Sequence, residues 1–212
     1  MAPGTTILIA VLVIAGAAAT LLQAAAVIQR GGGRAPAAFF SIGWLLLVFI
    51  PVAWGIFGGQ TAWYVQAVGA YDFAGAIPFH LGGGIGALAI LLFIPGQAGS
   101  TEQAESRRRP RVTILIAIGV LWIAWLTVME LDLNPFVLTI VINSVILAAA
   151  ALAAAMILER VLSGRNTARG ATIGLITGLA AATAACAFLE PATAGITGAI
   201  AGTIAAAIAF RK

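Results

Sequence analysis

The sequence predicts an all-α, polytopic membrane helix bundle, and three observations support this prediction. Hydrophobic residues make up 62% of the 212-residue chain and charged residues only 8%, whereas charged residues account for about 25% of an ordinary soluble domain. The mean hydropathy is +1.09. Long apolar runs, bounded by Gly, Pro or charged residues, recur along the whole chain. These features exclude a water-soluble fold and predict a single membrane domain over residues 1–212.

The apolar runs predict about seven transmembrane helices, since a helix needs about 20 apolar residues to cross a hydrocarbon core of about 30 Å. The first run follows a stretch without Lys or Arg, which favours a retained helix over a cleaved secretory signal. The last two runs are rich in Ala and Gly and could instead form a re-entrant pair. The predicted helices lie near residues 5–28, 37–57, 73–95, 112–129, 136–158, 171–189 and 192–210.

The basic residues predict the orientation of these helices. All of them follow the odd-numbered predicted helices: Arg30, Arg34, Arg107, Arg108, Arg109, Arg111, Arg160, Arg165, Arg169, Arg211 and Lys212. The positive-inside rule makes that side the cytoplasm, so we expect the N-terminus outside and the C-terminus inside. The opposite loops carry only acidic charges, namely Asp72, Glu130, Asp132 and Glu190. An acidic outer face would attract cations, although acidic residues are also simply tolerated there. The Ala- and Arg-rich composition favours a prokaryotic cell membrane.

His80 is the principal candidate for a functional side chain inside the membrane, because ionisable residues there are costly. It follows Asp72 by eight residues, which in a continuous helix is a rise of about 12 Å. A neutral imidazole offers one donor and one acceptor to a small polar solute and suits a pore for a weak base. Alternatively, His80 bonds a backbone carbonyl and only holds helices together. With one histidine and one cysteine, Cys186, the chain predicts no disulfide and no metal site.

Asp72 and a group of aromatic residues lie at the outer ends of the second and third predicted helices. The Asp72 carboxylate could accept hydrogen bonds from the first free helix amides, or it could attract cations at an outer mouth. Aromatic belts at the membrane surface are common, but one or two rings could also hold a cation in a vestibule. The aromatic residues are Trp54, Phe57, Trp63, Tyr64 and Tyr71.

Glycines recur at helix-packing spacing in the C-terminal part of the chain. Gly174 and Gly178 lie in the sixth predicted helix, and Gly198 and Gly202 in the seventh. Small residues at this spacing let helix backbones approach closely in lipid. The third predicted helix has a further glycine cluster at residues 82–86, directly after His80, which indicates tight packing or an irregular helix.

No pattern in the sequence indicates an enzyme. We find no phosphate-binding glycine loop, no nucleophile beside a base and no intramembrane carboxylate cluster, and we predict no cofactor and no nucleic-acid partner. The run SRRRPR at 106–111 could bind anionic lipid, but a solvated cytoplasmic loop that fixes topology is the simpler interpretation. Asn143 and Ser144 are interpreted as interhelical hydrogen-bonding residues.

Several strings resemble the ammonium transporter (Amt/Mep/Rh) family. YDFAGAIPFHLGGGIGAL at 71–88 is similar to the family signature in which Asp-Phe-Ala-Gly precedes a pore histidine, and WLLLVFIPVAWGIFGG at 44–59 resembles the preceding family helix. Downstream, LWIAW at 121–125, VINS at 141–144 and Glu159 follow the family order. The resemblance implies a partial ammonium-transporter fold, matching roughly the third to ninth of eleven family helices.

The resemblance also implies roles for individual residues. Asp72 matches the family's structural aspartate near the recruitment site, and His80 the first of two pore histidines. Phe57 stands where the family has a recruitment-site tryptophan, while Val128 and a small residue near Ala15 stand where it has gating phenylalanines. The second pore histidine belongs to a family helix that we expect this chain to lack.

Two functions follow as expectations. The chain could be a channel for ammonium, ammonia or another small neutral solute past His80, with neighbouring subunits completing the pore. Alternatively, it could be a non-conducting scaffold or sensor that assembles with a partner in the membrane. The family implies contacts with membrane lipid and a homo-oligomer, by default a trimer, or other membrane subunits.

Overall fold

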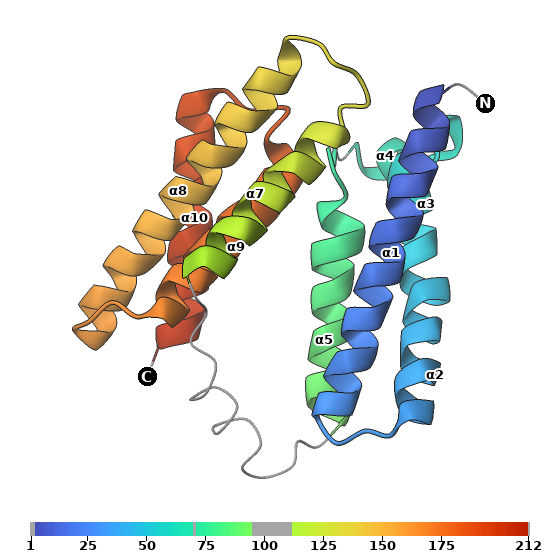
Figure 1. The fold of residues 1–212 in the computed structure, drawn as a ribbon, viewed down its shortest axis with the longest axis horizontal. Helices are drawn as coiled ribbons and strands as arrows, with labels where there is room; N and C mark the ends of the chain where they lie inside the picture. Colours follow the sequence, from blue (N-terminus) through green and yellow to red (C-terminus); the bar gives the residue numbers. More distant parts are fainter. Residues whose placement is uncertain (1–2, 70, 95–111, 212) are drawn as a thin grey trace. The chain divides into compact units, whose positions relative to one another are not determined.

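The computed structural model describes residues 3–69, 71–94 and 112–211, and it divides into two compact units, Met1–Arg108 and Arg109–Lys212 (Figure 1). The predicted single domain over residues 1–212 stays a prediction. The arginines at 107–111, which contribute to the predicted orientation, lie outside the described residues.

The described part of the first unit consists of three long helical segments with two short helical turns between the second and the third. The second and third segments each contain a π-helical stretch, η1 and η3. In chain order the elements are α1 (Pro3–Gln29), α2 (Arg34–Trp44), η1 (Leu45–Phe49), α3 (Ile50–Phe57), the 3₁₀ turn η2 (Gly59–Thr61), α4 (Trp63–Val68), η3 (Ile77–Leu81) and α5 (Gly82–Phe93). Helix α1 packs against both α2 and α5. Arg30, just after α1, donates from Nε to the carbonyl of Ile94 at 2.8 Å, which closes the C-terminal end of α5.

The described part of the second unit is a bundle of four helices. They are α7 (Val112–Val128), α8 (Phe136–Ser163), α9 (Ala168–Ala185) and α10 (Pro191–Phe210). Helix α8 packs against both α9 and α10, and α7 packs against α8 and α9. Each of α9 and α10 is one uninterrupted helix.

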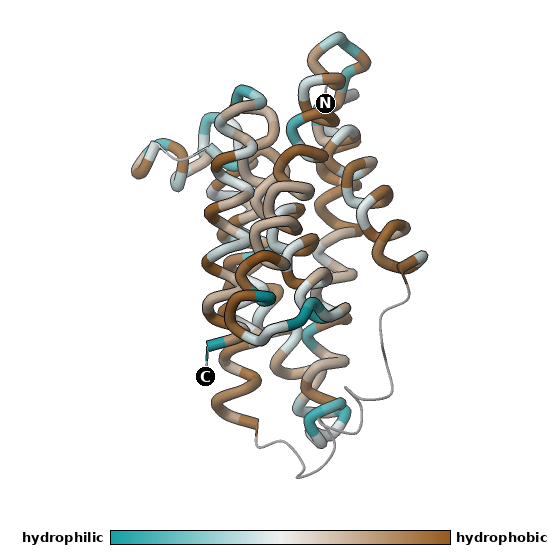
Figure 2. Tube along the Cα trace, turned by 90° about the vertical axis from the view of Figure 1, so that its left-hand side faces the viewer, coloured by the Kyte–Doolittle hydropathy of each residue, from teal (hydrophilic) through white to brown (hydrophobic). Residues whose placement is uncertain are grey.

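The helices present apolar side chains on their outer faces. Among the described residues, four helical segments are long and apolar enough to cross a membrane: Thr5–Gln29, Arg34–Phe57, Phe136–Ser163 and Pro191–Phe210. Two shorter apolar helices cover Ile77–Phe93 and Val112–Val128. In Figure 2 the helices are largely coloured as hydrophobic along their lengths, while hydrophilic colours gather near their ends. Side chains such as Leu22, Leu47 and Phe93 are more than two-thirds exposed, which is the arrangement that a lipid environment favours.

The glycines of α9 and α10 lie against the backbone of α8. A Cβ atom at Gly174 would lie 2.7 Å from the Leu152 Cα, and one at Gly178 would lie 2.6 Å from the Ala148 Cα. In α10, Cβ atoms at Gly198 and Gly202 would likewise meet backbone atoms of α8. Helix α8 therefore packs closely against the glycine faces of α9 and α10, as small residues at this spacing permit in membranes.

Asn143 holds the connection between α9 and α10. Its Nδ2 donates to the carbonyls of Cys186 at 2.8 Å and Leu189 at 2.6 Å, both beyond the end of α9. The side chain is fully buried. The Ser144 hydroxyl donates to the Ile140 carbonyl of its own helix, and it also hydrogen-bonds the side chain of Cys186 at the end of α9. Both residues predicted to hydrogen-bond between helices therefore reach the segment at the end of α9.

Replacing Asn143 by Leu is expected to destabilise the protein, because two buried carbonyls lose their donor. Interhelical hydrogen bonds in membrane proteins contribute about 0.6 kcal/mol on average and up to about 1.7 kcal/mol. We therefore expect the free energy of unfolding to fall by about 1–2 kcal/mol, measured by denaturant titration in mixed micelles. Thr203→Val is the control, because the exposed Thr203 hydroxyl donates to the Ala199 carbonyl of its own helix. Equal stability of both variants would contradict the prediction.

Candidate functional site

His80 lies on the π-helical turn η3 at the start of the third apolar segment. Pro78 precedes it by two residues, is buried and has no backbone N–H to donate. A π-turn widens the helix and is frequently found at functional sites. The His80 side chain itself is partly buried.

Asp72 caps this turn with both carboxylate oxygens. Oδ1 accepts from the amides of Gly75 at 3.1 Å and Ala76 at 2.7 Å, and Oδ2 accepts from the amide of Ile77 at 2.7 Å. Burial raises the pKa of this carboxyl, and the three amides act in the opposite direction because they favour the charged form. The carboxylate thus accepts hydrogen bonds from the free amides at the helix start, which also interact favourably with a negative charge.

The helix of His80 begins later than the sequence predicts. Residues 72–75 are not helical, and the first helical residue is Ala76. The interval from Asp72 to His80 is therefore not a continuous helical rise of eight residues, and the expected depth of about 12 Å does not apply. The reason is local: Gly75 has φ of +91°, a conformation that glycine adopts without strain and that folds the loop back over the carboxylate.

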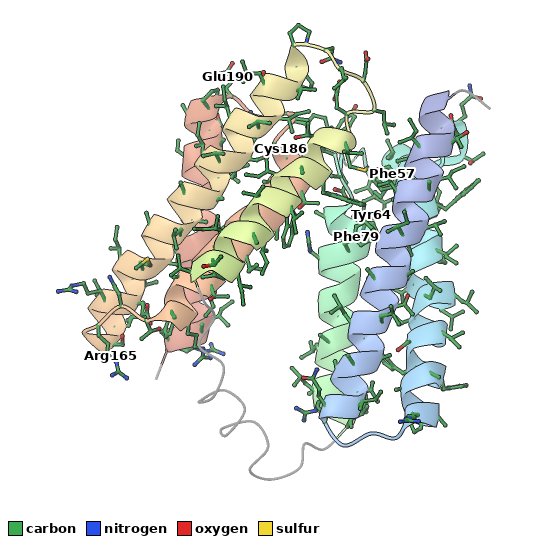
Figure 3. The ribbon with its side chains drawn as sticks, in the orientation of Figure 1. Phe57, Tyr64, Phe79, Arg165, Cys186 and Glu190 are labelled. Atoms are coloured by element: carbon green, nitrogen blue, oxygen red, sulfur yellow. The ribbon has the colours of Figure 1, made fainter. Side chains whose placement is uncertain are left out.

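Two aromatic rings lie beside Gly75 in the loop between Asp72 and His80. Gly75 lies against the Phe79 ring, because a Cβ there would meet Phe79 Cδ2 at 2.7 Å and Phe57 Cε2 at 3.5 Å. Phe57 ends α3, and Figure 3 labels it together with Phe79 and Tyr64. Of the predicted site residues, the structure thus brings Phe57 to the loop that Asp72 closes.

The other aromatic residues serve the segment around α3 and α4. The Trp63 indole packs over Gly55 and its Nε1 donates to the Pro51 carbonyl at 3.2 Å. Trp63 also meets Tyr64 edge to face, with ring centroids 5.7 Å apart. Trp54 is 60% exposed, so it is accessible to lipid or solute rather than part of the core.

Two buried side chains that the sequence analysis did not single out reach the glycines after His80. Gln23 of α1 donates from Nε2 to the Gly83 carbonyl at 2.9 Å, and Trp44 of α2 donates from Nε1 to the Gly82 carbonyl at 3.0 Å. A polar Gln in the middle of an apolar run was the available signal, since such residues are costly in a membrane unless paired.

Comparison with known proteins places the chain. A sequence model of the Ammonium Transporter Family matches residues 3–211. The chain belongs to this family. Its fold resembles the crystal structure of Saccharomyces cerevisiae Mep2 with a TM-score of 0.66 and 22% identity, over 82% of this chain and 39% of that chain. The fold is thus a multi-pass membrane helix bundle that corresponds to part of an ammonium-transporter fold.

Curated relatives match shorter stretches. Ammonium transporter 1 of Dictyostelium discoideum is 36% identical over 87 residues, which is 40% of this chain and 18% of the relative. Ammonium transporter Amt1 of Archaeoglobus fulgidus is 34% identical over 82 residues, or 39% of this chain and 20% of the relative. The matched stretches cover about a fifth of these relatives.

The remaining predicted residues of this Ammonium Transporter Family member lie in the second unit. Val128 ends α7 and is 50% exposed. Glu159 of α8 is fully buried and accepts from the backbone amide and the hydroxyl of Thr167, the residue that caps α9. A Cβ at Gly170 would clash with the Glu159 carboxylate. Glu159 therefore fixes the α8–α9 connection. In the described residues, no three His, Cys, Asp or Glu side chains gather as a metal site would require.

Proposed function

We propose that this protein takes part in moving ammonia or ammonium, or another small neutral solute, across a membrane past His80. The proposal is supported by the position of the chain's single histidine. His80 lies on the π-turn η3 of an apolar helix, and the Asp72 carboxylate caps the start of this turn. A neutral imidazole there can exchange hydrogen bonds with a small weak base. An ion would lose its hydration at high cost. Passage as the neutral base avoids that cost.

The site suggests an order of events. A cation approaches the outer end of α3, where Phe57 and Trp54 supply ring faces. Asp72 acts as scaffold in this scheme, because three backbone amides already occupy its carboxylate. The cation releases its proton to water on the outer side, and the neutral base passes His80. Further copies of the chain, by default a trimer, or other membrane subunits complete the path. Val128 and a small residue near Ala15 stand where the family has its gating phenylalanines, so neither gate carries a ring.

A non-conducting scaffold or sensor is the second candidate. It is favoured by the fact that Asp72 and the glycines of α9 and α10 are fully explained by folding contacts. In this alternative the exposed apolar faces bind another membrane subunit. We propose a prokaryotic cell membrane, with an outer N-terminus, for either function.

The deciding experiment is stopped-flow uptake of ammonia and methylammonium into proteoliposomes. We expect the parent protein to give flux above that of empty vesicles. In His80→Ala the flux should fall about tenfold, which corresponds to about 1.4 kcal/mol, the order of one lost hydrogen bond. Thr203→Val is the control and should conduct like the parent, because the exposed Thr203 hydroxyl bonds the Ala199 carbonyl of its own helix. Correctly folded protein with no excess flux would leave the scaffold as the better proposal.

A further inference from the structure

We propose that Gln23 and Trp44 are positioning residues that set the orientation of His80 through the backbone of the π-turn. The inference rests on the proposed role of His80 and concerns the same site. The segment around His80 has a low intrinsic helix stability. Pro78 cannot donate a backbone hydrogen bond, and residues 82–84 are three consecutive glycines, each of which costs a helix about 1 kcal/mol relative to Ala.

Two donors from other helices compensate for this weakness. Gln23 Nε2 lies 2.9 Å from the Gly83 oxygen and Trp44 Nε1 lies 3.0 Å from the Gly82 oxygen. These contacts bridge 60 and 38 residues of sequence. Both side chains are buried, at 6% and 5% exposure. A buried amide or indole N–H in a membrane interior is costly without a partner, so these bonds hold the two carbonyls firmly.

Gly86 makes room for both donors. A Cβ atom at this position would lie 2.7 Å from Gln23 Nε2 and 3.0 Å from the Trp44 indole. The glycine thus forms a notch one turn beyond the carbonyls that accept the bonds. The notch explains why two large side chains from α1 and α2 reach the same face of α5.

Side-chain hydrogen bonds hold η3 in place at both of its ends. At its start the Asp72 carboxylate accepts from three amides; at its end Gln23 and Trp44 donate to two carbonyls. Trp44 also packs on Phe49, which packs on Phe79, with centroids 5.7 Å and 5.0 Å apart. Phe79 precedes His80, so the same tryptophan supports the turn from its side. The direction of the imidazole depends on this backbone geometry.

The single histidine makes a direct test possible. Protein labelled with ¹⁵N-histidine and purified without a histidine tag reports the imidazole of His80 alone. We would compare its nitrogen resonances in lipid nanodiscs for the parent, Gln23→Met and Trp44→Phe. The first variant removes the donor at similar volume, and the second removes the donor but keeps an aromatic ring at this position. Thr20→Val is the control on α1, because the Thr20 hydroxyl bonds the Gly16 carbonyl of its own helix.

Each donor variant is expected to shift or split the His80 resonances, with the populations of ring states changing about fivefold, the effect of losing one hydrogen bond. Thr20→Val should reproduce the parent spectrum. Unchanged His80 resonances in either donor variant that keeps the parent's circular dichroism and melting temperature would overturn the inference. If one of the two variants does not fold, the other decides.

Flux measurements on the same variants, reconstituted into proteoliposomes, separate this inference from the proposed function. Altered spectra without any ammonia flux in proteoliposomes would reject transport but keep the positioning role. Normal flux in the parent with unaltered spectra in both donor variants would reject the positioning role but keep transport.

Discussion

Gly202→Ala is expected to lower the free energy of unfolding of the whole protein by about 2–3 kcal/mol, at the upper end of the overpacking range. The added Cβ would lie 2.7 Å from both the Cα and the carbonyl carbon of Ala151, and closer still to its oxygen. These are backbone atoms of α8, so no side-chain rotation can relieve the contact. Helix α10 would have to shift away from α8 at this contact.

The matched control lies on the same helix. A Cβ at Gly195 would meet Ile146 Cγ2 at 3.7 Å, an ordinary van der Waals distance. Gly195→Ala should therefore be neutral or stabilise the helix by up to about 1 kcal/mol through its higher helix propensity. Denaturant titration in mixed micelles, followed by far-ultraviolet circular dichroism, measures both. Equal effects of the two substitutions would show that the glycines of α10 do not act through close packing.

Asp72→Ala is expected to cost about 3 kcal/mol of unfolding free energy, because three partly or fully buried amides lose their acceptor and each unpaired buried amide costs about 1–3 kcal/mol before the loop relaxes. The loss should be smaller for Asp72→Asn, whose remaining oxygen can still accept from Gly75 and Ala76. Ammonia flux in proteoliposomes should fall together with stability, since the π-turn that carries His80 starts at this cap.

Asp132→Ala separates capping from electrostatic attraction. Asp132 is an exposed acidic residue of a loop predicted to lie on the same side of the membrane. If Asp72 acts mainly by attracting cations, both substitutions should lower uptake at low ionic strength, and salt should mask the difference. If it acts as a cap, Asp132→Ala leaves both stability and flux unchanged. A stable Asp72→Ala protein with reduced, salt-sensitive uptake would contradict our assignment.

The sequence predicts correctly that a third apolar helix exists, but it places the first residue of this helix too early. An apolar run after Asp72 indicates a helix, yet hydropathy does not respond to the backbone of residues 72–75. Those residues stay outside the helix because the carboxylate turns back onto the amides at 75–77 and Gly75 takes a positive φ. That competition between a loop and one more helical turn depends on three-dimensional contacts.

The glycine spacing of α9 and α10 was informative because it acts through a simple rule. Residues four apart share a helix face, and small residues on one face permit close approach. The identity of the partner was not contained in that rule. Both stripes could have faced the missing neighbours of another subunit. Tertiary packing placed both of them against α8, where Leu147 and Ala151 supply the facing backbone.

The sequence by itself determined the membrane class, the apolar helices, the glycine faces and the resemblance of the Asp72–His80 segment to ammonium transporters, because these depend on composition and local spacing. Only the tertiary structure decided how His80 is held. The bonds from Gln23 and Trp44 join segments 60 and 38 residues apart next to the π-turn. The notch at Gly86 makes room for both side chains. Such pairings leave no periodic trace in a sequence, since they are selected by which side chains meet after the helices have packed.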